Sequence, residues 1–347
     1  MATDLDFSML DESLGGESSD TGSNLIPVVE LSEDAIDPSY TRLSYSGLQD
    51  LHACPRYFQL KKLKAEQQED KMASLTFAFG HAVGTAIADL VSGKSLEQTL
   101  FELFATWEVD FFEENPKQKK SIAHAVAAVQ MLHAKMQDGF LSEYVVAKFK
   151  GEPAAELSFR VTMPSTFASA KFTYRGYLDL VLQNIMTGEF TVLENKTSSG
   201  TWVNHYMYKN SAQALGYSVI LDAIVEAMSG DVIAAYDVLY LVFMTKLDRY
   251  EDFNFPKSYQ QRALWLCDIM WDASLIEKLV REEGNYGIWP MHGESCYRFG
   301  RTCEYMDMCH MDTEYLMEPL RENQLEELDK EGNPTEYHIE YRIEELL

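Results

Sequence analysis

The spacing of apolar residues along the chain predicts an α/β fold. The stretches T-Y-R-G-Y-L-D-L-V-L-Q and F-T-V-L-E-N-K have the composition of buried strands, and a short turn around Thr187-Gly188 joins them. Further strands are expected within 143–163 and 234–246. Helical periodicity covers the segments 43–60, 73–92, 95–113, 117–139, 203–225 and 257–284.

Charged residues interrupt the two central strands. Asp179 lies inside one apolar run, and Glu194 and Lys196 close the next. Residues two apart on a strand share a face, so Glu194 and Lys196 point the same way, and the turn can bring Asp179 onto that face. Two carboxylates and an ammonium at one point suit Mg²⁺ binding and activation of water next to a phosphate. The alternative is a solvated strand face with a Glu–Lys pair.

Composition limits the class of protein. No run of eighteen apolar residues occurs, which argues against a membrane span. The N-terminus M-A-T-D-L-D-F-S lacks the basic and apolar parts of a secretory signal, so we expect a cytoplasmic protein. The net charge of −26 argues against simple nucleic-acid binding through a basic surface.

The acidic charge is concentrated at the two ends. Residues 1–41 contain ten acids and no Lys or Arg, and residues 310–347 contain twelve acids and three basic residues. We therefore expect a disordered acidic tail over 1–38, a folded domain over 39–310 and an acidic extension over 311–347 with a short helix at 318–329.

The cysteines predict a second chemical site. Cys296, Cys303 and Cys309 are clustered, and in an intracellular chain such a cluster indicates metal binding rather than disulfides. Three thiolates leave a four-coordinate site one ligand short, and Cys54 can supply the fourth. Zinc is one candidate, although the C-x₂₋₄-C spacing that zinc sites favour is missing. Cys267 has apolar neighbours and is expected in the core.

Five motifs in this order resemble one nuclease family. They are S-x-S-x-L-x-x-L-x-x-C-P-R-x-F from Ser44, G-H-x-V-G from Gly80, G-x-x-D ending at Asp179 with E-x-K at 194–196, Q-x-x-x-Y from Gln213 to Tyr217, and the three-cysteine tail. Together they resemble the PD-(D/E)XK superfamily, in its RecB-like and CRISPR-associated-exonuclease-like iron–sulfur form, which phages often carry.

The resemblance implies a restriction-endonuclease-like core. Its central mixed sheet is flanked by helices, with a helical insertion at about 93–140. An iron–sulfur clasp joins the N- and C-terminal parts, and Cys54, Cys296, Cys303 and Cys309 would hold a [4Fe–4S] cluster. In this comparison zinc is the alternative occupant.

The resemblance also assigns roles at the strand pair. Asp179, Glu194 and the backbone carbonyl of Asn195 would bind Mg²⁺ or Mn²⁺, and Lys196 would position the attacking water. Gln213 and Tyr217 would contact DNA and orient the site; without the preceding E-x-K they would be an ordinary amphipathic pair. Lys209 could contact phosphate one turn earlier.

His81 departs from the family pattern. The metal-binding histidine of related nucleases falls, in register, on Gly84, and His81 lies three residues earlier. Since residues i and i+3 share a helix face, His81 could still approach the metal, or it could be a core histidine.

The implied function is a metal-dependent DNA nuclease acting in recombination, repair or replication. We expect an exonuclease that prefers single-stranded DNA, in the host cytoplasm if a phage encodes it. The chain lacks G-x-x-x-x-G-K-[ST], so a helicase or recombination partner would supply unwinding. The alternative is a catalytically idle, DNA-mimicking acidic module that binds a basic protein.

Overall fold

A computed structural model describes most of the region from residue 36 to residue 313 and a short C-terminal strand. The described residues are 36–63, 75–107, 120–149, 151–162, 170–229, 235–298, 301–313 and 340–342. All of them fall in one structural unit, Leu31–Leu347. The acidic tail up to residue 35 and the predicted helix at 318–329 lie outside the described residues.

A mixed sheet forms the centre of this unit. Its main path is β12-β5-β6-β7-β8-β9, and β1 and β2 also pair with β6. The strands of this sheet are β1 (Arg42–Leu43), β2 (Tyr144–Val146), β5 (Ala155–Thr162), β6 (Thr173–Asn184), β7 (Phe190–Ser198), β8 (Ala235–Met244), β9 (Arg249–Ser258) and β12 (Glu340–Arg342). Two small hairpins pair β3 (Lys148–Phe149) with β4 (Glu152–Pro153) and β10 (Tyr297–Arg298) with β11 (Arg301–Thr302).

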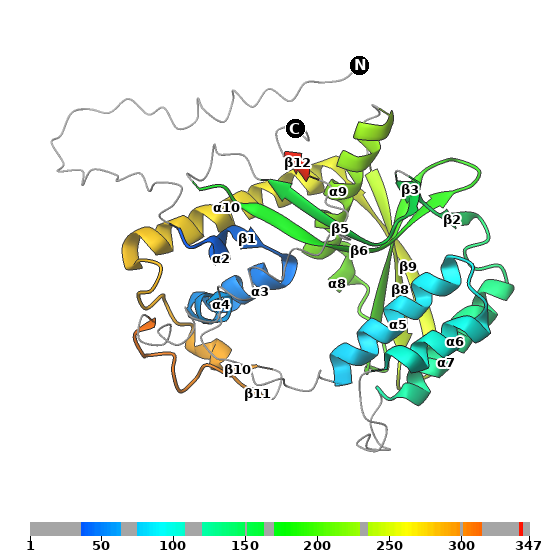
Figure 1. The fold of residues 1–347 in the computed structure, drawn as a ribbon, viewed down its shortest axis with the longest axis horizontal. Coiled ribbons are helices and arrows are strands. Elements are labelled where there is room, and N and C mark those ends of the chain that lie inside the picture. Colours follow the sequence, from blue (N-terminus) through cyan, green and yellow to red (C-terminus); the bar gives the residue numbers. More distant parts are fainter. Residues whose placement is uncertain are drawn as a thin grey trace. The chain divides into compact units, whose positions relative to one another are not determined.

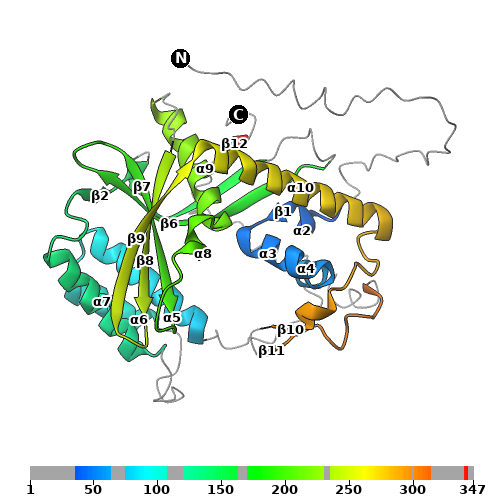
Figure 2. The ribbon, with the colours of Figure 1, turned by 180° about the vertical axis from the view of Figure 1, so that it is seen from behind.

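Helices cover both faces of the sheet (Figures 1 and 2). One face carries α5 (Leu75–Val91), α6 (Leu96–Thr106) and α7 (Ile122–Gln137). The other carries α2 (Pro38–Thr41), α3 (Tyr45–Ala53), α4 (Pro55–Lys62), α8 (Tyr206–Lys209), α9 (Ala212–Ser229) and α10 (Tyr259–Glu283). Successive residues of β7 pack into the hydrophobic cores on opposite faces of the sheet. Val192 faces the core under α9 and α10, and Leu193 faces the core under α5–α7. The expected α/β architecture is confirmed.

Local sequence signals fix the central hairpin and the helix that follows the sheet. Asn184 Oδ1 accepts from the backbone N–H groups of Met186 and Thr187, and Gly188 adopts φ +76°, which favours glycine. Ser258 and Gln261 form a capping box at the start of α10. The turn near Thr187-Gly188 therefore lies where the sequence predicts it.

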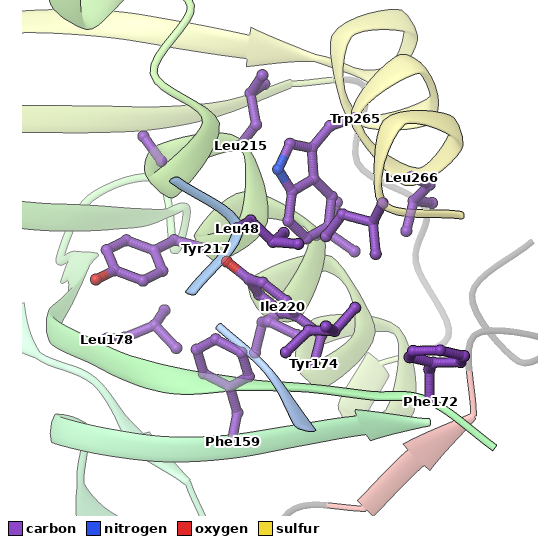
Figure 3. Close-up of a cluster of buried hydrophobic side chains, with 14 of the residues drawn as sticks. Leu48, Phe159, Phe172, Tyr174, Leu178, Leu215, Tyr217, Ile220, Trp265 and Leu266 are labelled. Atoms are coloured by element: carbon purple, nitrogen blue, oxygen red, sulfur yellow. The ribbon is translucent and has the colours of Figure 1, made fainter. Parts of the chain in front are cut away.

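Helix α9 packs closely against α10 at Gly216. A Cβ atom at this position would lie 2.7 Å from Trp265 Cζ2, so a larger residue would force the two helices apart. Figure 3 shows Trp265 among the buried side chains of α9 and the sheet. The ring of Tyr217 belongs to this cluster, and its hydroxyl points away from Trp265. The side of α9 that carries Tyr217 is therefore held in place by the core.

Arg56 joins the N-terminal helices to the C-terminal cysteine segment. Its side chain is 0% exposed, and it donates to the carbonyl oxygens of Cys309 (2.9 Å), Met311 (2.6 Å) and Gly287 (3.3 Å), to Gln59 Oε1 (2.6 Å) and to Thr313 Oγ1. A buried guanidinium is tolerated when its donors are satisfied in this way. The two ends of the domain therefore meet through protein contacts.

Several details differ from the sequence-based expectations. Strand β9 was not predicted, because it is rich in polar residues and shows only a weak alternation of polar and apolar positions. The expected helix over 203–225 is divided into α8 and α9, since the chain leaves helical geometry around Asn210. Cys267 is exposed on α10, so its assignment to the core was wrong.

Two of the predicted domain boundaries also fall inside the sheet-centred unit. Ile36 is buried and Asp37 caps α2, although both were assigned to the acidic tail. Residues Glu340–Arg342 of the predicted extension pair in parallel with β5.

None of the helices in the described parts of the chain is long and apolar enough to cross a membrane.

Replacing Arg56 by Ala should destabilise the protein by about 3 kcal/mol or more, because a buried side chain is removed and its several hydrogen-bond acceptors lose their donors. Urea unfolding followed by circular dichroism measures this. Arg281→Ala, which removes an exposed guanidinium from α10, is the matched control and should change the stability by less than about 0.5 kcal/mol. Equal stabilities of the two variants would contradict the role given to Arg56.

Candidate functional site

The hairpin of β6 and β7 brings the two predicted carboxylates together. The antiparallel ladder ends at the pair Leu180–Leu193, and one step further Asp179 lies across from Glu194. At this point a side chain replaces a backbone carbonyl as the hydrogen-bond acceptor: Asp179 Oδ2 accepts from the backbone N–H of Asn195 at 3.2 Å. The predicted convergence of Asp179 on the Glu194 face is therefore what the structure has.

A chain of polar contacts runs from Glu194 to the core. Lys196 Nζ forms an ion pair with Glu194 Oε1 and donates to Gln213 Oε1 at 2.9 Å. Gln213 Nε2 donates in turn to the Tyr217 hydroxyl at 2.6 Å. Because Gln213 and Tyr217 lie in the first turns of α9, the packing of this helix decides where the Lys196 ammonium sits.

Burial changes the acid–base properties of this group. The Glu194 side chain is 1% exposed, and desolvation raises its pKa to about 7; Lys196 opposes the rise and Asp179 adds to it. Burial also opposes the charge of Lys196, but Glu194 and Asp179 outweigh it and raise the pKa of Lys196 above its usual value. Lys196, at 35% exposure, reaches the surface.

The negative charge of the two carboxylates is only partly compensated by protein groups. Glu194 Oε2 is buried and has no hydrogen-bond partner among the described residues. When both acids are ionised, the group carries two negative charges and one positive charge, so a divalent cation would compensate both the orphaned oxygen and the repulsion between the acids. The donor set therefore fits Mg²⁺ or Mn²⁺ chemically. Across the described residues, however, no group of three or more His, Cys, Asp or Glu side chains is arranged to hold a metal ion.

Helix α5 carries His81, the histidine that was considered as a metal ligand. His81 is exposed there, and Gly84 is the residue that faces β7, since a Cβ at Gly84 would lie 3.9 Å from Asn195 Nδ2. Asn195 alternates with Glu194 and Lys196 along the strand, so its side chain lies on the opposite face from theirs. No side chain from position 84 reaches the carboxylates, which agrees with the register shift in the sequence. Metal binding by His81 or by the carbonyl of Asn195 stays a prediction.

Two tyrosines next to the site were missed by the sequence analysis. The Tyr208 ring on α8 lies within electrostatic reach of Lys196 and Glu194, and Tyr45 on α3 lies within reach of Lys196. Tyr208 immediately precedes Lys209, which is exposed as a phosphate contact requires. The only signal for Tyr45 was its place between the two serines of the N-terminal motif.

The four predicted cluster ligands line one cavity. Cys54, Cys296, Cys303 and Cys309 surround a space of about 320 Å³ together with Met291 and Tyr57. Cys54 precedes α4, and its Sγ accepts from the N–H of His292 at 3.4 Å. Desolvation, together with the neighbouring thiols, raises the pKa of Cys303 and of Cys309. Cys54 and the three C-terminal cysteines, far apart in sequence, thus line one cavity.

The raised pKa of Glu194 predicts an unusual dependence of stability on pH. A carboxyl whose pKa is higher in the folded state binds more protons when folded, so its contribution is full below about 4.5 and is lost as the pH rises through about 7. In chelator, the wild type should lose up to about 3 kcal/mol relative to Glu194→Gln between pH 4.5 and pH 8. Urea unfolding at several pH values measures this difference.

Glu189→Gln, in the exposed β6–β7 turn, is the control for that experiment. A constant stability difference between wild type and Glu194→Gln across the pH range would contradict the burial argument.

The chain was compared with known proteins. Among solved structures, the chain is similar to a "Putative exonuclease" from Eubacterium rectale, with 14% identity, a TM-score of 0.42 and coverage of 84% of this chain and 100% of that one. It is also similar to SSO0001, with 11% identity, a TM-score of 0.22 and coverage of 66% and 87%. No relative was found among curated proteins.

The family comparison covers most of the chain. The profile of the PD-(D/E)XK nuclease superfamily matches residues 42–310, which include both carboxylates, Lys196 and all four cysteines of the cavity. The chain therefore belongs to the PD-(D/E)XK nuclease superfamily.

Proposed function

We propose that the protein hydrolyses phosphodiester bonds in DNA at the Asp179–Glu194–Lys196 site, as an exonuclease that prefers single strands. The observation that carries this proposal is the buried, partly unpartnered Glu194 carboxylate opposite Asp179, with Lys196 held beside it. A purely structural Glu–Lys pair would not require a second carboxylate there. Recombination, repair or replication, alongside a helicase or recombination protein, is the proposed setting.

Asp179 and Glu194 would hold Mg²⁺ or Mn²⁺, with the carbonyl of Asn195 as a further ligand. When bound, the metal lowers the pKa of a water molecule and polarises the phosphate. Lys196 orients the attacking water and stabilises the negative charge that develops on the phosphate oxygens. Gln213 fixes the Lys196 ammonium, and Tyr217 fixes Gln213, so both act as positioning residues.

Lys196→Ala and Asp179→Ala should each lower the rate of cleavage at least about 100-fold, because each removes a charge that the transition state uses. End-labelled single- and double-stranded DNA, incubated with Mn²⁺, Mg²⁺ or chelator, measures cleavage and its polarity. Lys278→Ala, on the exposed side of α10, is the control and should cleave like the wild type.

A variant of Lys196 with native circular dichroism and full activity would refute the proposed site. An iron-replete wild type that cleaves no DNA in either metal would favour the acidic binding module instead.

We also propose that the thiol-lined cavity holds a [4Fe–4S] cluster. The support is that all four cysteines border one space. Four thiolates are the usual ligand set of such a cluster, and the C-x₂₋₄-C spacing that zinc sites favour is missing from this chain. Zinc remains the alternative occupant.

Cys303→Ser should lose bound iron, because the cluster loses one of its four thiolate ligands. Iron and acid-labile sulfide are measured after purification without oxygen, and thermal unfolding is measured alongside. Cys267→Ser is the matched control, since Cys267 is exposed on α10 and does not line the cavity. Zinc in place of iron in the wild type would contradict the cluster.

A further inference from the structure

Three large apolar side chains are exposed between strand β7 and helix α9. Trp202, Tyr206 and Met207 are 68%, 83% and 72% exposed. They follow β7 directly, and we call them the α8 surface. Exposed apolar groups that gather in one segment commonly mark a binding site.

The backbone beneath the α8 surface is firmly held. Lys257 is 0% exposed and donates to the carbonyl oxygens of Tyr208 at 3.0 Å and Lys209 at 2.6 Å. The Tyr240 hydroxyl donates to the same Tyr208 oxygen at 3.1 Å. Val203, between Trp202 and Tyr206 in the sequence, packs against the core. The exposure of the surface is therefore a property of a fixed segment.

The α8 surface is continuous with the candidate active site. The Tyr208 ring packs on Tyr240 and Phe253, with centroid distances of 4.8 and 5.2 Å. Tyr240 is the β8 residue that pairs with Glu194. Tyr206 and Met207 immediately precede it on the same short helix, which is labelled in Figure 1. A strand whose phosphate lies at Lys196 therefore has its neighbouring nucleotides close to these side chains.

The charges around the surface favour bases over phosphates as its ligand. Lys209 is an exposed cation on α8, but Glu251 lies nearby, 3.4 Å from His205 and paired with Arg249. Such a mixed neighbourhood attracts phosphates weakly. Aromatic faces stack on any unpaired base, whereas the bases of a duplex are already stacked on each other.

We propose that the α8 surface binds single-stranded DNA by stacking unpaired bases on Trp202 and Tyr206. The inference rests on the proposed nuclease function for the position of the strand, and it assigns the preference for single strands to these two rings.

The test measures binding of full-length protein to oligothymidylate of about 15 nucleotides in chelator, where no cleavage occurs. The double variant Trp202→Ala/Tyr206→Ala should bind at least about tenfold more weakly than the wild type. An abasic strand of equal length should bind the wild type as weakly as oligothymidylate binds the double variant. The lost affinity should depend little on salt, because stacking releases few counterions.

Trp271→Ala is the matched control, since Trp271 is 77% exposed but lies on α10; its binding and cleavage should equal those of the wild type. Equal affinity of wild type and double variant, or of base-bearing and abasic strands, would overturn the inference. A wild type that binds the bases but cleaves nothing with Mn²⁺ would refute the nuclease proposal and leave base stacking established. Metal-dependent cleavage without any preference for base-bearing strands would support the nuclease proposal and refute base stacking on the α8 surface.

Discussion

The burial of Glu194 is the constraint on which the site depends. A carboxylate inside a protein is costly unless its charge is compensated. Lys196 compensates part of it and is held by Gln213, and Gln213 is held by Tyr217. The Tyr217 ring packs in the core between the sheet and α10, next to the close contact of Gly216 with Trp265. Hydrophobic packing thus positions an ammonium several residues away.

The same burial makes the site incomplete by itself. With Asp179 nearby, the acidic group has a surplus of negative charge, and Glu194 Oε2 lacks a partner among the described residues. A structure selected only for stability would replace this carboxylate, since an apolar residue of similar size is often no less stable in a core. Its presence therefore fits a binding role better than a structural one.

The thiol-lined cavity depends on a different interaction. Arg56 belongs to the same C-P-R motif as Cys54, and it donates to the backbone of Cys309 and of the residues that follow. The guanidinium fixes the C-terminal segment on α4, and Cys54 precedes the same helix. Protein contacts therefore bring the four thiols to one cavity without a cluster as the sole link between the two ends.

Sequence reasoning succeeded where the signal was local. The β6–β7 hairpin follows from the Thr187-Gly188 turn and the apolar runs on each side, and the shared face of Glu194 and Lys196 follows from strand geometry. Sequence reasoning failed where tertiary contacts decide whether a segment forms a strand or which way a side chain points. Strand β9 forms because β8 offers it a partner, although its own residues are largely polar. Cys267 has apolar neighbours in sequence, yet the rotation of α10 points it to solvent.

The sequence by itself determined the identity and order of the chemical groups, namely two acids, a lysine, a glutamine–tyrosine pair and four cysteines. These follow from residue types at fixed spacings, which no packing can alter. Only the tertiary structure decided that Gly84 rather than His81 faces β7, that Tyr208 lies beside the site, and that Trp202 and Tyr206 remain exposed. Such facts depend on how helices rotate and pack against the sheet, and that packing is set by contacts between residues far apart in the chain.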